Sequence, residues 1–352
     1  MKGIKVGNKT SKYPIIQGGM GVGVSMHNLA GNVSKEGGIG IISTADIGYQ
    51  EDDFEKDPMK SNLRAIGKEI QKARSIAGED KIIGVNIMVA LKNYADIVKE
   101  CVKQKIDLII SGAGIPKELP EYVQGTNTKI APIVSSFRCC KLIVEHWIKK
   151  YNYIADMIVI EGPEAGGHLG FKKEELEEGA KPKLEDITLE VVNYIKQVEI
   201  KTGKSIPVIA AGGIWDSKDI KRFLNLGASG VQMATRFVAT NECDASIEFK
   251  NAYINAKDED IKIIKSPVGM PGRAINNNFI KKMEKENCKI NRCYNCIKTC
   301  NVLKSPYCIT KALINSVKGD LDNGLIFCGS SVGKIKNIVS VHDLMQELVC
   351  EL

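Results

Sequence analysis

The chain has 352 residues, of which 43% are hydrophobic and 6% aromatic, and it carries a formal net charge of +7. This apolar content is enough for a sizeable core, and the length fits either one large α/β barrel with an appendage or two ordinary domains. The basic side chains are scattered over helical segments and form no stripe interleaved with aromatic residues, so we expect no nucleic-acid partner. Small molecules that carry phosphate, or an acidic carrier protein, remain compatible with this charge.

We expect neither a membrane-spanning helix nor disulfides. The sequence has no run of about eighteen apolar residues, which a membrane-spanning helix requires. The segment Met1–Asn8 lacks the apolar core of a signal peptide. Eleven cysteines without an export signal indicate reduced thiols or metal ligands. Together these features predict a cytoplasmic protein.

Eight short apolar runs alternate with helix-period segments. Continuous β-branched runs are typical of parallel strands that are buried on both faces. The expected strands are Pro14–Gly18, Ile39–Ser43, Ile82–Met88, Leu108–Ser111, Lys129–Val134, Met157–Glu161, Val208–Ala211 and Gly230–Met233. The expected helices are Ala65–Ala77, Tyr94–Gln104, Leu142–Lys150, Leu189–Val198 and Asp219–Leu226. This repetition predicts a (β/α)8 TIM barrel over residues 1–245.

The main alternative architecture is an open doubly wound sheet, which requires a Gly-x-Gly-x-x-Gly turn after its first strand. The loop at 18–25 reads Gly-Gly-Met-Gly-Val-Gly-Val-Ser and does not have that spacing, which favours the barrel. Beyond Ala245 the pattern changes, and we expect residues 246–352 to form a helical, cysteine-containing extension that packs on the barrel. Its segment Ser266–Arg273, with two prolines and two glycines, is a candidate lid.

A glycine-rich loop that contains His168 follows the sixth expected strand. The segment Glu161–Gly170 reads Glu-Gly-Pro-Glu-Ala-Gly-Gly-His-Leu-Gly. Glycine lets the backbone approach a flat ligand closely while the imidazole is aimed at it. A histidine is often only a packed residue, but catalytic groups gather on loops at the carboxyl ends of barrel strands. We therefore predict a catalytic role for His168.

Two glycine-containing turns follow the last two expected strands. The segment Ala210–Ile214 contains the pair Gly212 and Gly213, and Gly227–Phe237 repeats the arrangement one strand later. In TIM barrels the loops after strands seven and eight commonly form a phosphate site from backbone N–H groups. A tight turn alone would explain one glycine pair, whereas two consecutive units favour phosphate binding.

The segments Gln17–Gly23, Glu164–His168, Ala210–Ile214 and Gly227–Phe237 together resemble the motifs of the nitronate monooxygenase family, formerly called 2-nitropropane dioxygenases. Flavin-dependent enoyl-acyl-carrier-protein reductases share these motifs. The resemblance implies a barrel that binds FMN without covalent attachment and a histidine, His168, that faces the reactive side of the flavin. The residues that it implies as FMN contacts are Gly19, Met20, Asn86, Gly167, Gly212, Gly213, Gly230, Gln232, Met233 and Thr235.

The chain departs from the family pattern in three places. Ala234 stands where a glycine is usual, which would tighten the phosphate loop. Ser135 and Ser136 replace the lysine or threonine that often follows the fifth strand. The well-known monooxygenases lack a cysteine cluster in the extension.

The resemblance implies two chemistries, and the motifs do not choose between them. In a nitronate monooxygenase, His168 acts as a general base on the acidic carbon next to the nitro group or binds the nitronate anion, and O2 completes the oxidation. In a reductase, NADH or NADPH reduces FMN, which passes hydride to the double bond of an enoyl thioester or to a quinone. A non-catalytic flavin- or metal-binding module would leave His168 without a purpose. We favour the monooxygenase, and we expect a homodimer that forms through the extension.

Four cysteines of the extension have the spacing Cys-x2-Cys-x3-Cys-x7-Cys: Cys293, Cys296, Cys300 and Cys308. This pattern is typical of soft-metal ligands. It resembles the iron–sulfur segment of flavin-barrel dienoyl-coenzyme A reductases, in which the last gap is longer. An iron–sulfur cluster would supply single electrons to FMN, whereas a zinc ion would fix the extension to the barrel. Buried thiols without a metal are the third alternative.

Overall fold

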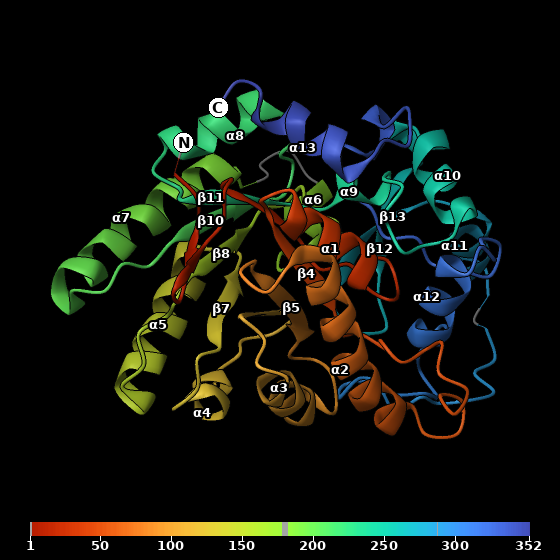
Figure 1. Ribbon diagram of the computed structural model, residues 1–352. Helices are drawn as coiled ribbons and strands as arrows, with labels where there is room; N and C mark the ends of the chain where they lie inside the picture. Colours follow the sequence, from red (N-terminus) through yellow and green to blue (C-terminus); the bar gives the residue numbers. More distant parts are fainter. Residues whose placement is uncertain (1, 178–181, 287) are drawn as a thin grey trace.

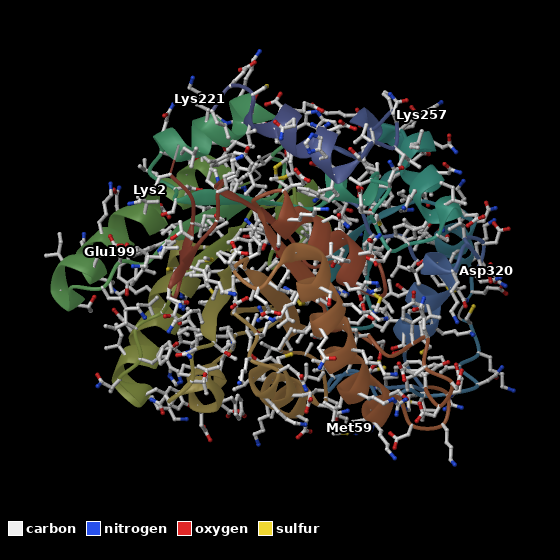
Figure 2. The ribbon with its side chains drawn as sticks, in the orientation of Figure 1. Lys2, Met59, Glu199, Lys221, Lys257 and Asp320 are labelled. Carbon is white, nitrogen blue, oxygen red and sulfur yellow. The ribbon has the colours of Figure 1, made fainter. Side chains whose placement is uncertain are left out.

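The computed structural model describes residues 2–177, 182–286 and 288–352. Figure 1 shows a barrel of strands surrounded by helices, with the C-terminal part of the chain, coloured cyan to blue, along one side of it. Within the described residues no helix is long and apolar enough to cross a membrane. Charged side chains such as Lys2, Lys221, Lys257 and Asp320 project outward from different parts of the chain (Figure 2).

Eight parallel strands close into a barrel, which confirms the predicted TIM-barrel fold. Each strand pairs with the next in chain order, and β11 returns to pair with β3. Their ends differ from the predicted ones by at most one residue. The strands are β3 (Ile15–Gln17), β4 (Ile39–Ser43), β5 (Ile83–Met88), β6 (Leu108–Gly112), β7 (Lys129–Val134), β8 (Ile158–Glu161), β10 (Val208–Ala211) and β11 (Gly230–Met233).

Helices follow the strands and cover the outside of the barrel. The five expected helices are all present, and four of them are longer than predicted. One of these, α2, starts early because the side chain of Asp57 accepts a hydrogen bond from the N–H of Lys60 and Pro58 occupies its first turn. The helices are α1 (His27–Lys35), α2 (Pro58–Ala77), α3 (Tyr94–Lys103), α4 (Leu119–Val123), α5 (Phe137–Tyr151), α6 (Lys173–Glu177), α7 (Leu184–Thr202), α8 (Ser217–Asn225) and α9 (Thr235–Val238).

The side chains of each barrel strand alternate between two cores. Inward-facing residues such as Ile41, Ile110 and Val159 form a separate small cluster inside the barrel. Outward-facing residues belong to the large core between the barrel and its helices. The inner cluster fills the amino-terminal half of the barrel, so any ligand site must lie at the carboxyl ends of the strands.

A short hairpin of β1 (Lys5–Val6) and β2 (Lys9–Thr10) precedes the barrel. Its residues Ile4 and Val6 pack into the inner cluster. A Cβ atom on Gly230 would lie 2.6 Å from Cδ1 of Ile4 and 2.7 Å from the carbonyl oxygen of Pro14. The absence of a side chain at Gly230 therefore lets this end of the barrel close.

The C-terminal extension contains both helices and strands. Its last helix, α13, packs against α1 and α8 of the barrel. Its two strands, β12 and β13, form a three-stranded antiparallel sheet with β9 (Gly167–His168), which belongs to the loop after β8. The extension consists of α10 (Ile247–Asn255), η1 (Asp258–Asp260), β12 (Ile261–Lys265), β13 (Pro271–Ile275), α11 (Asn278–Met283), α12 (Ile309–Val317), η2 (Val332–Lys334) and α13 (Val341–Val349).

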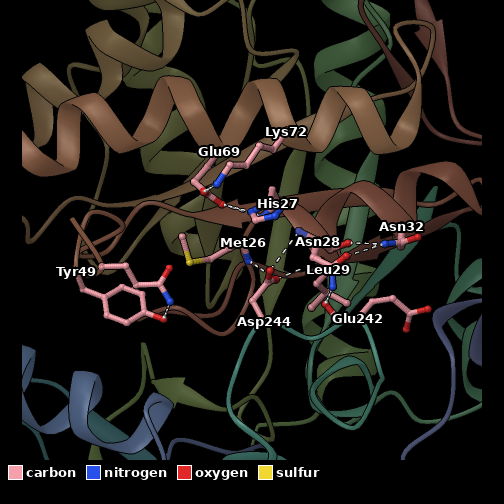
Figure 3. Close-up of polar contacts among 11 residues, drawn as sticks. Met26, His27, Asn28, Leu29, Asn32, Tyr49, Glu69, Lys72, Glu242 and Asp244 are labelled. Atoms are coloured by element: carbon pink, nitrogen blue, oxygen red, sulfur yellow. Dashed lines mark hydrogen bonds and ion pairs between the residues drawn. The ribbon is translucent and has the colours of Figure 1, made fainter. Parts of the chain in front are cut away.

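The sequence did not predict helix α1, whose first turn is capped from far along the chain. The carboxylate of Asp244 accepts hydrogen bonds from the backbone N–H groups of Met26, at 2.8 Å, and Leu29, at 3.1 Å (Figure 3). The cap and the helix are separated by more than 200 residues in sequence. No local start signal therefore marks this helix.

His27, in the same turn, forms an ion pair with Glu69 of α2, with 2.6 Å between Nδ1 and the carboxylate (Figure 3). This hydrogen bond raises the pKa of His27 above its usual range. Burial opposes the ionisation of Glu69, but the hydrogen bond from His27 lowers its pKa overall. The pair is therefore fully charged between the ordinary carboxylate pKa, about 4.3, and the ordinary histidine pKa, about 6.5.

We predict that His27→Ala lowers the free energy of unfolding by about 1–2 kcal/mol at pH 6. The stabilisation is present below the unfolded-state pKa of histidine and is lost as the pH rises through the higher folded-state pKa, so the loss becomes smaller at pH 9. Urea unfolding of the wild type and of His27→Ala at pH 6 and pH 9 measures this loss of unfolding free energy. His342→Ala, which removes an exposed histidine paired with Glu36, is the control. A loss that does not change with pH would contradict the ion pair.

Candidate active site

A cavity opens at the carboxyl ends of the barrel strands, and His168 lies on its wall. Nine of the ten residues predicted to contact FMN line this cavity together with His168: Gly19, Met20, Asn86, Gly167, Gly212, Gly213, Gln232, Met233 and Thr235. The tenth, Gly230, does not line it, because it lies where β11 begins, at the closed end of the barrel. The predicted residues at the ends of five different strands thus lie together around one cavity.

His168 is held by residues of the extension. Its Nε2 atom lies 2.7 Å from the hydroxyl oxygen of Ser266, and its ring contacts the ring of Phe327 edge-on with 4.9 Å between centroids. The hydroxyl oxygen of Ser266 also accepts a hydrogen bond from the N–H of Val268. Burial lowers the pKa of His168 to about 4, so its imidazole is uncharged at neutral pH.

The glycines before His168 allow the loop to pack against the extension. A Cβ atom on Gly166 would lie 2.6 Å from the carbonyl carbon of Cys328, and Gly167 has a φ of 76°. Gly167 pairs with Arg273 of β13, and the guanidinium of Arg273 donates a hydrogen bond to the carbonyl of Ala165. The loop can therefore lie between the barrel and β13 only without side chains at these positions.

The segment Ser266–Arg273, which the sequence suggested as a lid, is the turn between β12 and β13. Ser266 contacts His168 directly, and the hydroxyl of Thr299 donates a hydrogen bond to the carbonyl of Val268. This segment therefore contacts His168 through Ser266, and none of its residues lines the cavity.

A second part of the cavity has the features of a phosphate site. Gly212 and Gly213 adopt left-handed φ angles of 100° and 76°, and helix α8 follows, capped by the side chain of Asp216. After the neighbouring strand β11, the hydroxyl of Thr235 accepts a hydrogen bond from the N–H of Gly329 in the extension. Backbone N–H groups in such a glycine turn, next to a helix N-terminus, suit a bound anion.

The barrel mouth carries polar side chains between these two parts. Asn86 packs against Gly19, where a Cβ atom would lie 2.4 Å from Cβ of Asn86. The Oε1 atom of Gln232 is buried and has no hydrogen-bond partner among the described residues. An orphaned acceptor of this kind requires a donor from a ligand, such as an N–H or hydroxyl group.

These features fit FMN. The glycine turn and Thr235 suit its phosphate, while Gln232 and Asn86 suit its polar ring edge or ribityl hydroxyls. Met20 and Met233 add apolar surface for a flat ring. The arrangement accordingly combines an anion site, a flat polar–apolar slot and an uncharged histidine in one cavity.

Sequence reasoning missed the contribution of the extension to this cavity. The cavity-lining residues from the extension are Phe249, Tyr253, Leu313, Ser316, Leu325, Phe327, Cys328, Gly329, Ser330 and Ser331. The Gly-Ser-Ser turn at 329–331 was the one available signal, because small polar turns often contact phosphate. Glu161, at the end of β8, also lines the cavity and was not singled out.

The structure does not support the predicted iron–sulfur or zinc site at Cys293, Cys296, Cys300 and Cys308. No group of three or more potential ligand side chains among the described residues is placed to hold a metal ion. Of the four cysteines, Cys293 is exposed and the other three are partly buried.

The same segment has a structural role. The backbone around Cys296 pairs with the loop after β5, since its carbonyl accepts from the N–H of Lys92 at 2.9 Å, and the N–H of Lys298 donates to Ala90. Cys308 is the residue at which helix α12 begins.

We predict that Gly212→Ala lowers the affinity for FMN by at least about tenfold, which corresponds to ~1.4 kcal/mol. Its φ is 100°, and a Cβ atom would lie 2.9 Å from the backbone nitrogen of Ala165, so the turn must shift. Flavin fluorescence during titration of the apoprotein measures the affinity. Gly125→Ala is the matched control, because Gly125 has a φ of 78° with open space around it. Equal effects of the two substitutions would contradict the phosphate site.

Several known proteins are similar to this chain. A probable nitronate monooxygenase from Staphylococcus aureus (strain Newman) is 29% identical over 297 residues, which covers 77% of this chain and 78% of that protein. The structure of FabK from Thermotoga maritima aligns with a TM-score of 0.74 at 27% identity and covers 97% of this chain and 93% of FabK.

The nitroalkane oxidase of Streptomyces ansochromogenes aligns with a TM-score of 0.71 at 20% identity, over 97% of this chain and 96% of the oxidase, and this likeness shows a shared fold. The sequence model of the nitronate monooxygenase family matches residues 4–351. The match extends through the C-terminal extension as well as the barrel. The chain therefore belongs to the nitronate monooxygenase family of oxidoreductases.

Proposed function

We propose that this protein is an FMN-dependent oxidoreductase that oxidises alkyl nitronates, with His168 as the residue that handles the substrate. The observation that carries this proposal is the uncharged, hydrogen-bonded His168 in a cavity that also has a phosphate end. Family membership supports the same class of reaction. The chemistry lies at the carboxyl ends of the strands, as in other TIM-barrel enzymes.

The residues that would hold FMN come from opposite parts of the cavity. The backbone N–H groups at Gly212 and Gly213 and the hydroxyl of Thr235 would bind the phosphate. Asn86 and Gln232 would bind the polar groups of the ribityl chain or ring. When bound, FMN accepts electrons from the substrate and delivers them to O2.

His168 would act as a general base towards the carbon next to the nitro group, or as a hydrogen-bonding partner of the nitronate. A pKa of about 4 makes the imidazole a weak base in the empty cavity. An anion that forms beside it would stabilise the imidazolium and raise this pKa in the complex. Ser266 would fix the ring orientation, because its hydroxyl is bonded to Nε2.

The wall of the cavity suits a small apolar substrate. Met88 and Ile133 come from the barrel, and Leu313, Leu325 and Phe327 come from the extension. Such a surface would bind the alkyl part of a nitronate through burial of apolar area. The polar side chains of the cavity would form hydrogen bonds with the nitro oxygens.

The second candidate is NAD(P)H-dependent reduction of an enoyl thioester or quinone on the same FMN. The observation in its favour is the similarity to FabK, an enoyl-acyl-carrier-protein reductase, at 27% identity over nearly the whole chain. In this reaction His168 would position or protonate the product. Anaerobic mixing decides between the two: bleaching of the flavin by ethyl nitronate supports the first, and bleaching by NADH or NADPH supports the second.

We predict that His168→Ala lowers kcat for oxygen uptake with nitroethane, whose acidic carbon must lose a proton, by roughly 10²–10⁴-fold, as expected for loss of a proton-transfer residue. An oxygen electrode measures the rate, and flavin absorbance shows that FMN is still bound. His342→Ala, far from the cavity, is expected to retain the wild-type rate. Unchanged turnover in His168→Ala would remove this residue from the mechanism.

A further inference from the structure

The strand β8 places one carboxyl group in the mouth of the barrel. Met157 and Val159 belong to the cluster inside the barrel, whereas Ile158 and Ile160 belong to the outer core. Glu161 continues the inward series, because side chains alternate along a strand. It lines the same cavity as His168.

The carboxyl group of Glu161 has no hydrogen-bond or ion-pair partner among residues 2–177, 182–286 and 288–352. Other carboxylates of the chain in partly or fully buried positions do have one. Glu69 pairs with His27, and the carboxylate of Asp46 accepts a hydrogen bond from the hydroxyl of Thr310 at 2.7 Å. Glu161 is half-buried on the cavity wall, so its carboxyl group is free to bind a ligand that fills the cavity.

The surroundings of Glu161 favour the neutral acid. On β10, Ala211 pairs with Glu161 and Ala210 pairs with the preceding Ile160. Both of these β10 residues are apolar. On β7 the inward-facing neighbour is Ile133. Within the described residues no charged side chain contributes to the ionisation of Glu161, and burial alone raises its pKa to about 8. His168, which lines the same cavity, is itself uncharged.

We propose that Glu161 is a second catalytic residue that acts as a carboxylic acid and donates a hydrogen bond to a nitro oxygen of the bound substrate. This role rests on the proposed oxidation of nitronates and deepens it. A neutral acid stabilises negative charge on the substrate oxygen, while a carboxylate at the same place would repel the anion. The cavity would then recognise a small organic anion without using any lysine or arginine.

This assignment has a direct consequence for pH dependence. As the pH rises through about 8, Glu161 becomes ionised, so kcat/KM for ethyl nitronate is expected to fall about tenfold per pH unit. Glu161→Gln keeps a neutral donor of similar shape and is expected to abolish this fall while retaining most of the activity at pH 7. Glu161→Ala removes the donor and is expected to lose about 10²-fold in kcat at pH 7.

The pH profiles of the FMN-loaded wild type, Glu161→Gln and Glu161→Ala are compared with that of Glu145→Gln, which alters an exposed carboxylate of α5. The control is expected to follow the wild type. A wild-type profile that stays flat above pH 8, or an unchanged fall in Glu161→Gln, would overturn the assignment.

A second measurement separates this assignment from the proposed function. Infrared difference spectra of the holoenzyme at pH 7 are expected to show a protonated carboxyl band that Glu161→Gln removes and that sodium nitrate, a planar oxyanion, shifts to lower frequency. Absence of that band, or no shift with nitrate, would overturn the role of Glu161 whatever the substrate is. If the wild type does not oxidise ethyl nitronate, the proposed function fails and the infrared result alone decides the assignment.

Discussion

The pairing of β9 with β13 is the constraint on which the site depends. Two residues, Gly167 and His168, form a short strand against Arg273 and Gly272. The loop after a barrel strand is normally free to vary, but here antiparallel hydrogen bonds fix it to the extension. The buried guanidinium of Arg273 adds a hydrogen bond to the carbonyl of Ala165. The backbone pairing thus determines the position of the imidazole. Ser266 adds one further contact, between its hydroxyl oxygen and Nε2 of His168.

This pairing makes the extension part of the site. The barrel provides the glycine turns and the inward-facing Asn86, Glu161 and Gln232, whereas the extension closes the cavity around His168 and beside Thr235. A barrel alone would leave the histidine loop without its partner strand. Part of the cavity wall and the positioning of His168 therefore depend on residues that lie after position 245, where the barrel pattern in the sequence ends.

The barrel and much of the site could be predicted because their signals are local. Continuous apolar runs gave all eight strands, and glycine turns at strand ends marked the cavity residues. Helix α1 escaped prediction because its cap, Asp244, lies far along the chain. Glu161 escaped prediction because its significance is that it has no hydrogen-bond partner in the described part of the chain, which only the fold reveals. The metal prediction for Cys293 to Cys308 was not supported, since cysteine spacing along a chain does not bring thiolates together in space.

The central claim is that the cavity holds FMN through a phosphate turn from the barrel. The most direct measurement is to purify the protein, release its ligand with acid and quantify the flavin by chromatography. The account predicts one FMN per chain without covalent attachment. Release of FAD, or no flavin even after incubation of the protein with FMN, would contradict it.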